Sequence, residues 1–218
     1  MDPAHLHQVQ VLWDKGFGRA LGMTSFQEYL ATIPEVPKAP PIEYLNRLIL
    51  VDRRLGFRDG CWSVGLFTSE RNSTFISHDL MVEKKLKDVY WMWCQIRHPY
   101  DFFGLEVNGP NRGPNDYRRL FKQHPRGREV GLDVIEFAAL YAQDPSVVGT
   151  KEEPKIVDIL NSKHCVDSQY HAYATWLEDS ITPCLPRVSY RYESHRCYPA
   201  IRWEPEGSHK EINTAVHL

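Results

Sequence analysis

The sequence predicts an α+β protein, in which an N-terminal helical hairpin and a proline-rich connector precede one mainly antiparallel or mixed sheet packed with helices. Helix-capping residues precede apolar stretches of helical spacing at the start and in the second half of the chain. Strand-like runs are grouped in the middle and at the end, without regular alternation with helices. We therefore expect a hairpin at 1–33, a connector at 34–41 and a single α+β domain at 42–218.

The first helix is predicted from the residues at its two ends. Asp2 can cap it, Pro3 suits its first position and Gly16 follows its last turn. A second helix is expected after Thr24, whose side chain would form a capping box with Gln27. The prolines of the connector exclude a helix there, because proline lacks the amide donor that a helix requires.

The elements of the main domain follow from composition and periodicity. Aromatic and β-branched residues mark the strand candidates, which are 47–52, 62–67, 73–77, 89–97, 100–107, 187–194 and 198–203. Apolar spacing predicts helices at 155–162 and around 169–178. The central core helix is expected to begin at Asp133, with Glu136 as its capping-box partner, and to end at Pro145.

Composition and the first residues limit the cellular location and the binding partners that we expect for this protein. The formal net charge of -2 and the pI near 6.5 argue against a dedicated nucleic-acid-binding protein. The first residues lack the basic and apolar regions of a signal peptide, and no apolar run is long enough to span a membrane. The 5 cysteines lie at wide spacings that do not fit a disulfide framework. The sequence therefore predicts a cytoplasmic protein with reduced thiols and no membrane partner.

Charged side chains are segregated along the chain. Between 112 and 128, Asp116 is the only acid among the cations Arg112, Arg118, Arg119, Lys122, Arg126 and Arg128, whereas 129–158 is mainly acidic. These cations would attract phosphate or nucleic acid if they line one groove. Alternatively, two neighbouring helices compensate each other across exposed rims, where ion pairs contribute little.

A ligand pocket is predicted where the turn that begins at Asn108 meets the C-terminal strands. Glycine-rich turns expose backbone amides that can bind an anion. The C-terminal strands add arginines interleaved with aromatic rings, which can pair with phosphates and stack on bases. The predicted ligand-binding residues are Asn108, Asn111, Arg112, Arg191, Arg202 and Trp203. The same alternation also fits a strand whose tyrosines pack inward while its arginines face solvent.

Two catalytic hypotheses come from the histidines and cysteines. A zinc site would use His164, Cys165 and His171, because zinc prefers imidazole and thiolate ligands. A thiol hydrolase would use Cys197 or Cys165 as its nucleophile and His195 or His171 as its base. Such cysteines also occur as small buried hydrophobic residues. No cofactor other than this zinc is implied.

Several short pieces of the chain occur in an order shared with a known group of proteins. These pieces are Gln8-Val9 to Leu12 with Gly16, Gly127-Arg128, Gly131-Leu132-Asp133-x-x-Glu136, Pro145 and Tyr198-Pro-Ala-Ile-x-Trp203. In them the chain resembles uncharacterised bacterial proteins of comparable length, classed as a domain of unknown function. The chain departs from that group at 207–218, which lacks a Trp/Gly-rich tail. The resemblance implies a bacterial, intracellular origin and supplies no activity or catalytic residues.

Standard catalytic signatures are absent from the sequence. The chain has no G-x-S-x-G nucleophile elbow, no P-loop, no H-E-x-x-H zinc motif and no G-x-G-x-x-G dinucleotide-binding pattern. We therefore expect a binding or interaction module that recognises an anionic small molecule, a protein or a nucleic acid. The alternative is an enzyme of unrecognised class, either a thiol- and histidine-based hydrolase or a metal-dependent one.

Overall fold

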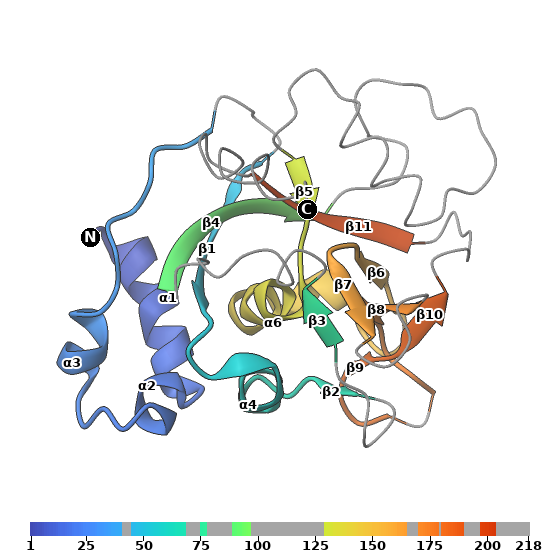
Figure 1. The fold of residues 1–218 in the computed structure, drawn as a ribbon, viewed down its shortest axis with the longest axis horizontal. Helices are drawn as coiled ribbons and strands as arrows, with labels where there is room; N and C mark the ends of the chain where they lie inside the picture. Colours follow the sequence, from blue (N-terminus) through green and yellow to red (C-terminus); the bar gives the residue numbers. More distant parts are fainter. Residues whose placement is uncertain are drawn as a thin grey trace, which may run out of the picture.

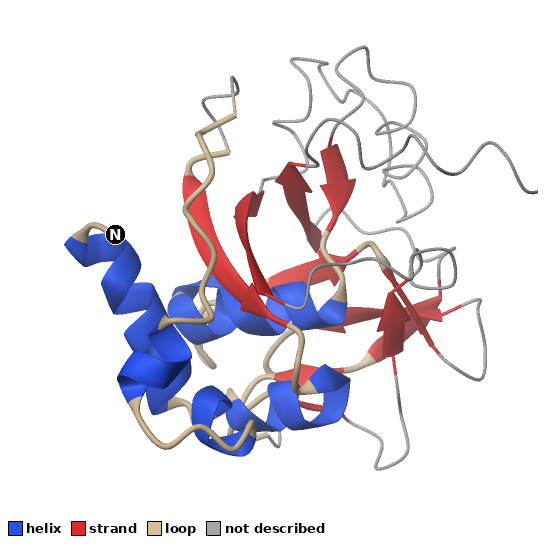
Figure 2. Ribbon diagram, turned by 60° about the vertical axis from the view of Figure 1, so that its left-hand side comes forward, coloured by secondary structure: helices blue, strands red, loops and turns tan. Residues whose placement is uncertain are grey.

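The computed structural model describes residues 1–40, 45–68, 75–77, 89–96, 129–164, 170–178, 180–189 and 197–203, and it confirms the predicted α+β class (Figure 1). The helices within these residues are α1 (Pro3–Asp14), α2 (Phe17–Ala20), α3 (Phe26–Leu30), α4 (Gly56–Ser63), α6 (Val134–Gln143) and the 3-10 helix η2 (Pro145–Val148). Figure 2 shows the helices gathered toward one side of the molecule and most strands toward the other. Within the described residues, no helix has both the length and the apolar character needed to cross a membrane.

In the described part of the chain, the strands form one large mixed sheet and two small ones. They are β1 (Arg47–Asp52), β2 (Phe67–Thr68), β3 (Phe75–Ser77), β4 (Val89–Ile96), β5 (Glu129–Gly131), β6 (Ile156–Ile159), β7 (Ser162–His164), β8 (Tyr170–Ala174), β9 (Cys184–Leu185), β10 (Arg187–Ser189) and β11 (Cys197–Trp203). The 7-stranded sheet has the order β1-β4-β11-β6-β8-β10, with β5 also paired to β11. Its pairs are antiparallel except for β11 with β6. Strand β2 pairs with β9, and β3 pairs with β7.

Helix α6 lies at the centre of the core, as its apolar sequence predicts. Asp133 caps it and forms the predicted capping box with Glu136. Phe137 and Leu140 are fully buried, and α6 packs against β1. In Figure 1, β4 arches above α6, so that the curved sheet and the helix enclose the main hydrophobic cluster.

The N-terminal hairpin shares this hydrophobic core. Val9, Leu12, Phe17 and Tyr29 belong to the same buried cluster as the residues of β1 and α6. Asp2 caps α1 and Gly16 follows it with a φ of 92°, as predicted. The hairpin therefore packs directly onto the sheet.

The N-cap predicted for the second helix of the hairpin, which is the short α3, is wrong by one residue. Ser25, not Thr24, is the N-cap of α3, and its hydroxyl accepts a hydrogen bond from the Glu28 amide at 3.2 Å. The Glu28 carboxylate in turn accepts one from the Thr24 amide at 2.8 Å. Adjacent serine and threonine both suit a cap by type, so their spacing to an acidic residue decides between them.

Three element predictions are wrong in type. The strand expected at 62–67 is the end of α4 followed by a turn, and only Phe67–Thr68 is extended. The helices expected at 155–162 and 169–178 are strands β6 to β8. Their apolar residues are clustered, which suits a helix, but both segments are largely buried within a sheet, where a strand also carries near-continuous apolar runs. The strand expected at 100–107 lies outside the described residues.

Candidate functional site

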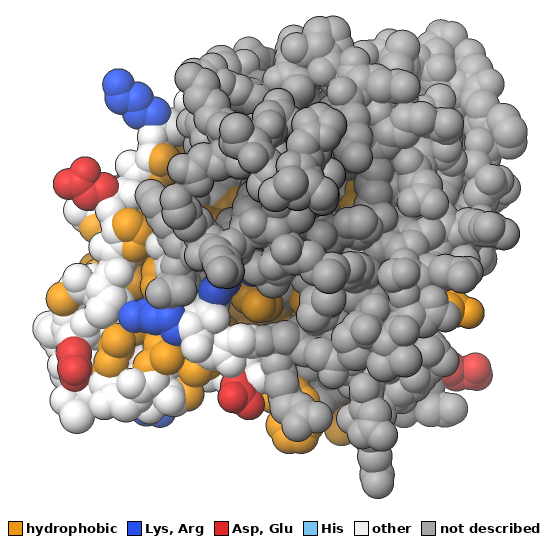
Figure 3. Space-filling view, in the orientation of Figure 1, with side chains coloured by type: hydrophobic (Ala, Val, Ile, Leu, Met, Phe, Trp, Pro, Cys, Tyr) orange, Lys and Arg blue, Asp and Glu red, His pale blue; other side chains and the backbone are white. Residues whose placement is uncertain are grey.

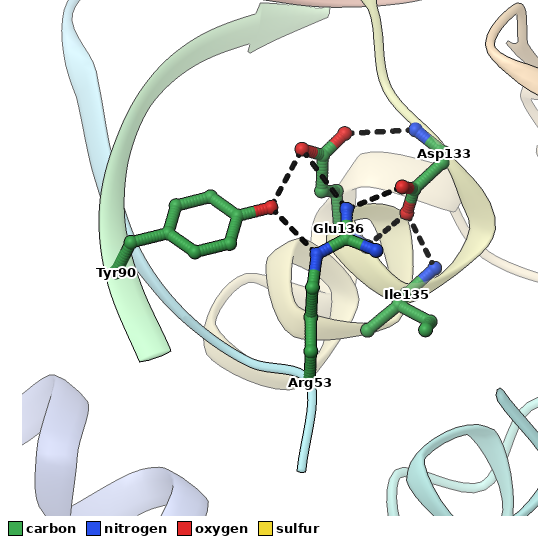
Figure 4. Close-up of polar contacts among 5 residues, drawn as sticks. All are labelled: Arg53, Tyr90, Asp133, Ile135 and Glu136. Carbon is green, nitrogen blue, oxygen red and sulfur yellow. Dashed lines mark hydrogen bonds and ion pairs between the residues drawn. The ribbon is translucent and has the colours of Figure 1, made fainter. Parts of the chain in front are cut away.

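Buried charged side chains meet at the start of α6 (Figure 4). We call Arg53, Tyr90, Asp133 and Glu136 the ionic cluster. Arg53 follows the end of β1, Tyr90 lies near the start of β4, and the two acids belong to the capping box of α6. The cluster therefore joins two strands and the central helix through their side chains.

The carboxylates are positioned by the helix terminus itself. Asp133 Oδ1 accepts hydrogen bonds from the amides of Ile135 at 2.9 Å and Glu136 at 3.0 Å. Glu136 Oε2 accepts one from the Asp133 amide at 2.9 Å. These bonds satisfy amides that have no partner within the helix, and the positive end of the helix dipole favours both negative charges. This part of the cluster is predictable from the D-x-x-E pattern.

Arg53 and Tyr90 complete the cluster from the sheet. Arg53 Nη2 contacts Asp133 Oδ2, and it lies 3.3 Å from Glu136 Oε1. The Tyr90 hydroxyl accepts a hydrogen bond from Arg53 Nε at 3.0 Å and donates one to Glu136 Oε1 at 2.7 Å. The sequence analysis missed both residues, although the charged pair Asp52-Arg53 directly after the apolar run LILV is a signal that could have found Arg53.

The electrostatics of the cluster follow from its burial. The side chains of Arg53, Asp133 and Glu136 are 7%, 2% and 0% exposed. Burial raises the pKa of Asp133, and the nearby charge of Glu136 raises it further, against the opposing effect of Arg53. Burial acts to lower the pKa of Arg53, but Asp133 and Glu136 hold that pKa above its ordinary value. The charges of the cluster are buried and bonded to one another, which suits a structural role.

A second buried contact fastens the hairpin to β1. Asp52 accepts hydrogen bonds from the Tyr29 hydroxyl at 2.9 Å and from Arg54 Nε and Nη2 at 2.9 and 2.7 Å. Burial raises the pKa of Tyr29, and the charge of Asp52 raises it further. The two arginines after LILVD therefore bind different parts of the fold. Arg53 contacts Asp133 at the start of α6, whereas Arg54 contacts Asp52 and the Thr32 hydroxyl of the N-terminal hairpin.

The predicted ligand-binding residues are only partly placed by the structure. Arg202 and Trp203 lie on β11, where Arg202 is in register with Cys94 of β4 on one side and with Val130 of β5 on the other. Trp203 is in register with Glu129. The remaining candidates lie outside the described residues, namely Asn108, Asn111, Arg112 and Arg191.

The strand pairing shows which strands are connected by the segment that contains the basic stretch 112–128. Strand β4 ends at Ile96, strand β5 begins at Glu129, and both strands pair with β11. Strands in a sheet lie about 4.8 Å apart, so β4 and β5 are separated by roughly 10 Å. The segment containing 112–128 therefore begins and ends on the two neighbours of the strand that carries Arg202.

His171 is the only catalytic candidate whose side chain the structure describes. It is fully buried on β8, and its Nε2 lies 3.1 Å from Asp158 Oδ1 on the neighbouring strand β6. A carboxylate in this position orients an imidazole. Because Asp158 is also buried, the contact joins β6 to β8 within the sheet and has no surface open to a substrate. The sequence analysis missed Asp158, since its proximity to His171 depends on strand pairing.

The structure does not bring the zinc candidates together within its described part. His164 ends β7, but its side chain and the whole of Cys165 are not described. Among the residues that are described, no group of three or more His, Cys, Asp and Glu side chains could hold a metal ion. His171 is paired with Asp158 instead. The zinc site stays a prediction.

The hydrolase candidates are likewise placed only in part. Cys197 begins β11, where it is in register with Ile156 at the start of β6. His171 lies beyond the opposite end of that strand, past the Ile159–Ala172 pair. With about 3.3 Å per residue along a strand, this register separates Cys197 from His171 by more than hydrogen-bonding distance. His195 and Cys165 lie outside the described residues.

The described thiols are free and buried, and we expect them to be unreactive. Burial raises the pKa of Cys61 to about 12 and that of Cys94 to about 12, so few thiolates exist at neutral pH. Iodoacetamide at pH 7 should label both at least about a hundredfold more slowly than an exposed thiol. Peptide mapping by mass spectrometry measures this, with urea-unfolded protein as the control. Rapid labelling of either residue in the folded protein would contradict the described burial.

Known proteins supply no further assignment. No family model, no curated protein and no solved structure matches the chain. The fold and the site define an α+β protein whose described buried charges are paired within its own framework. Any function must therefore be argued from the residues of this chain.

Proposed function

We propose that the chain is a cytoplasmic binding module for an anionic, phosphate-bearing partner. One observation carries the proposal: the basic stretch 112–128 directly precedes β5 in the sequence, and Val130 of β5 is in register with Arg202 of β11. Several cations close together in the sequence can create a positive field that attracts phosphates. The cytoplasmic location is supported by the free thiols Cys61, Cys94 and Cys184.

The described surface supports assigning the binding to that stretch. Figure 3 shows cations, anions and hydrophobic side chains intermixed over the described part of one face, without a large patch of positive or of negative charge there. Two arginines after β1 are engaged with carboxylates, the buried Arg53 with Asp133 and the partly buried Arg54 with Asp52. The stretch 112–128 is thus the strongest concentration of positive charge that the sequence offers.

Binding to a single-stranded RNA oligonucleotide tests this proposal. We expect binding that weakens steeply with salt, measured by fluorescence anisotropy of the labelled RNA. Replacing Arg118, Arg119 and Lys122 by glutamine should weaken binding about tenfold or more at low salt. It should also reduce the slope of log K against log salt by about 2, since each phosphate contact on a single strand contributes about 0.7.

The matched control removes the same charge elsewhere. Lys15, Lys38 and Lys155 are exposed in the structure, so their replacement by glutamine changes the net charge equally without touching 112–128. The control should retain most of the affinity. Equal weakening by both triple variants, or the absence of salt-dependent binding, would contradict the proposal. Competition by inorganic phosphate at low concentration would instead indicate a small anion as the preferred ligand.

A hydrolase is the alternative, and one contact favours it. Asp158 orients the His171 ring as a carboxylate does in acid–base catalysis. The full burial of His171 weighs against it, because a base must reach the proton that it removes. The binding module therefore has the stronger support.

A further inference from the structure

Strand β1 forms one end of the 7-stranded sheet, and its inner edge pairs with β4. In the described part of the chain, no strand pairs with its outer edge. Residues Leu48–Val51 are buried and apolar. An apolar edge strand with open amides and carbonyls is a template for pairing with another chain. The outer edge therefore needs other hydrogen-bond partners.

Gln143, the last residue of α6, provides such partners at Leu50. Its Oε1 accepts a hydrogen bond from the Leu50 amide at 3.0 Å, and its Nε2 donates one to the Leu50 carbonyl at 2.8 Å. A residue on a neighbouring antiparallel strand would make the same pair of bonds. Nε2 also donates to the Ala139 carbonyl at 2.9 Å, which fixes the amide in this orientation.

Gln8 acts at the same edge from a different helix. Its Nε2, on α1, donates a hydrogen bond to the Leu48 carbonyl. Leu48 and Leu50 are two residues apart on a strand, so their outward backbone groups lie along one edge. Side-chain amides from α1 and α6 thus occupy adjacent positions on the β1 edge, where another strand would otherwise bind.

We propose that Gln8 and Gln143 close the outer edge of β1 against pairing with β1 of a second copy of this chain. Two β1 strands placed antiparallel about Leu50 present matching donors and acceptors to each other, which permits a two-fold dimer. The glutamine amides bind the β1 backbone in preference to a second β1 strand, because they belong to the same molecule and have a high effective concentration. A second strand also requires α1 to move from the edge, and the Gln8 contact opposes that movement.

The double substitution Gln8→Met and Gln143→Met tests the proposal. Methionine keeps the length and flexibility of glutamine but removes the amide. The control is Gln10→Met, because Gln10 lies on α1 and bonds only to Asp14 among the described contacts. Light scattering after size-exclusion chromatography, over a wide concentration range, should show dimers of the double variant at concentrations at least about tenfold lower than for the control.

Hydrogen exchange at the Leu50 amide provides the second readout. In dilute protein, the double variant should exchange this amide about tenfold faster than the control, since its acceptor is gone. Faster exchange without self-association at any concentration would overturn the proposal, because the open edge would then not attract a second copy. Unchanged exchange would overturn it as well. If the double variant does not fold, Gln143→Met alone is judged by the same two measurements.

Discussion

Replacing Arg53 by methionine is expected to lower the free energy of unfolding by about 3–5 kcal/mol, because it breaks the buried ion pair with Asp133 by removing its cation. Arg53 Nη2 contacts Asp133 and lies 3.3 Å from Glu136, and the three side chains are almost fully buried. Methionine retains most of the aliphatic volume, so packing changes are small. Urea unfolding followed by tryptophan fluorescence measures the change. Arg19→Met, at an exposed position, is the control and should cost less than about 1 kcal/mol.

The loss should depend on pH in a defined direction. Burial and the charge of Glu136 raise the pKa of Asp133 above its unfolded value of 3.8. Because the pKa of Asp133 is higher in the folded protein, protonation of this carboxyl favours the folded state. This contribution to stability is fully present below pH 3.8 and is lost as the pH rises through the folded pKa. Removing Arg53 raises that pKa further, so the difference between variant and wild type should be smaller at pH 5 than at pH 8. A loss that is small and independent of pH would show that the ionic cluster does not stabilise the fold.

A second substitution separates the charge effect from packing. Adding Glu136→Gln to Arg53→Met removes the negative charge next to Asp133, and glutamine still fits the capping box. We expect the double variant to recover part of the lost stability at pH 8 and little at pH 5. No recovery at either pH would indicate that the methionine side chain itself disturbs the packing.

Replacing Gly131 by alanine is expected to lower the free energy of unfolding by about 2–3 kcal/mol through overpacking. A Cβ atom at this position would lie 2.4 Å from the Leu160 Cβ and 3.0 Å from the Asn161 amide nitrogen. Neither contact is with a flexible chain end, so the backbone must shift. That shift would strain the hydrogen bond from the Asn161 amide to the Leu132 carbonyl and the pairing of β5 with β11. Urea unfolding midpoints measure the effect.

Gly60→Ala is the matched control for this prediction. Gly60 lies within α4, and a Cβ there would meet nothing within 4 Å. Alanine should stabilise the helix by up to about 1 kcal/mol, since glycine is a poor helix former. Gly131→Ala with the stability of the wild type would contradict the prediction. It would show that the turn beginning at Leu160 can move away from β5, so that their close approach does not require glycine at 131.

Elements with strong local signals were predictable from the sequence. Asp2 with Pro3 starts α1, and Asp133 with Glu136 starts α6, because side chains near the helix start satisfy its free amides wherever the helix lies. Strands β4 and β11 combine aromatic and β-branched residues over enough positions to be recognised. These predictions depend on neighbours in sequence only.

The segments at 155–162 and 169–178 show where local reasoning stops. Ile156, Val157 and Ile159 fit helical spacing as well as a buried strand, and β6 is a strand because it lies between β11 and β8. The candidate site shows the same limit. The capping-box acids were predicted from spacing, whereas Arg53 and Tyr90 reach them from segments 80 and 46 residues away.

The sequence by itself determined the α+β class, the caps of α1 and α6 and the apolar stretches that form the core. The tertiary structure alone decided which strands pair, that Asp158 meets His171, and that Gln8 and Gln143 close β1. The physical reason is the range of the forces involved. Caps and periodicity act within a few residues, whereas strand register and buried ion pairs depend on which distant segments desolvate each other.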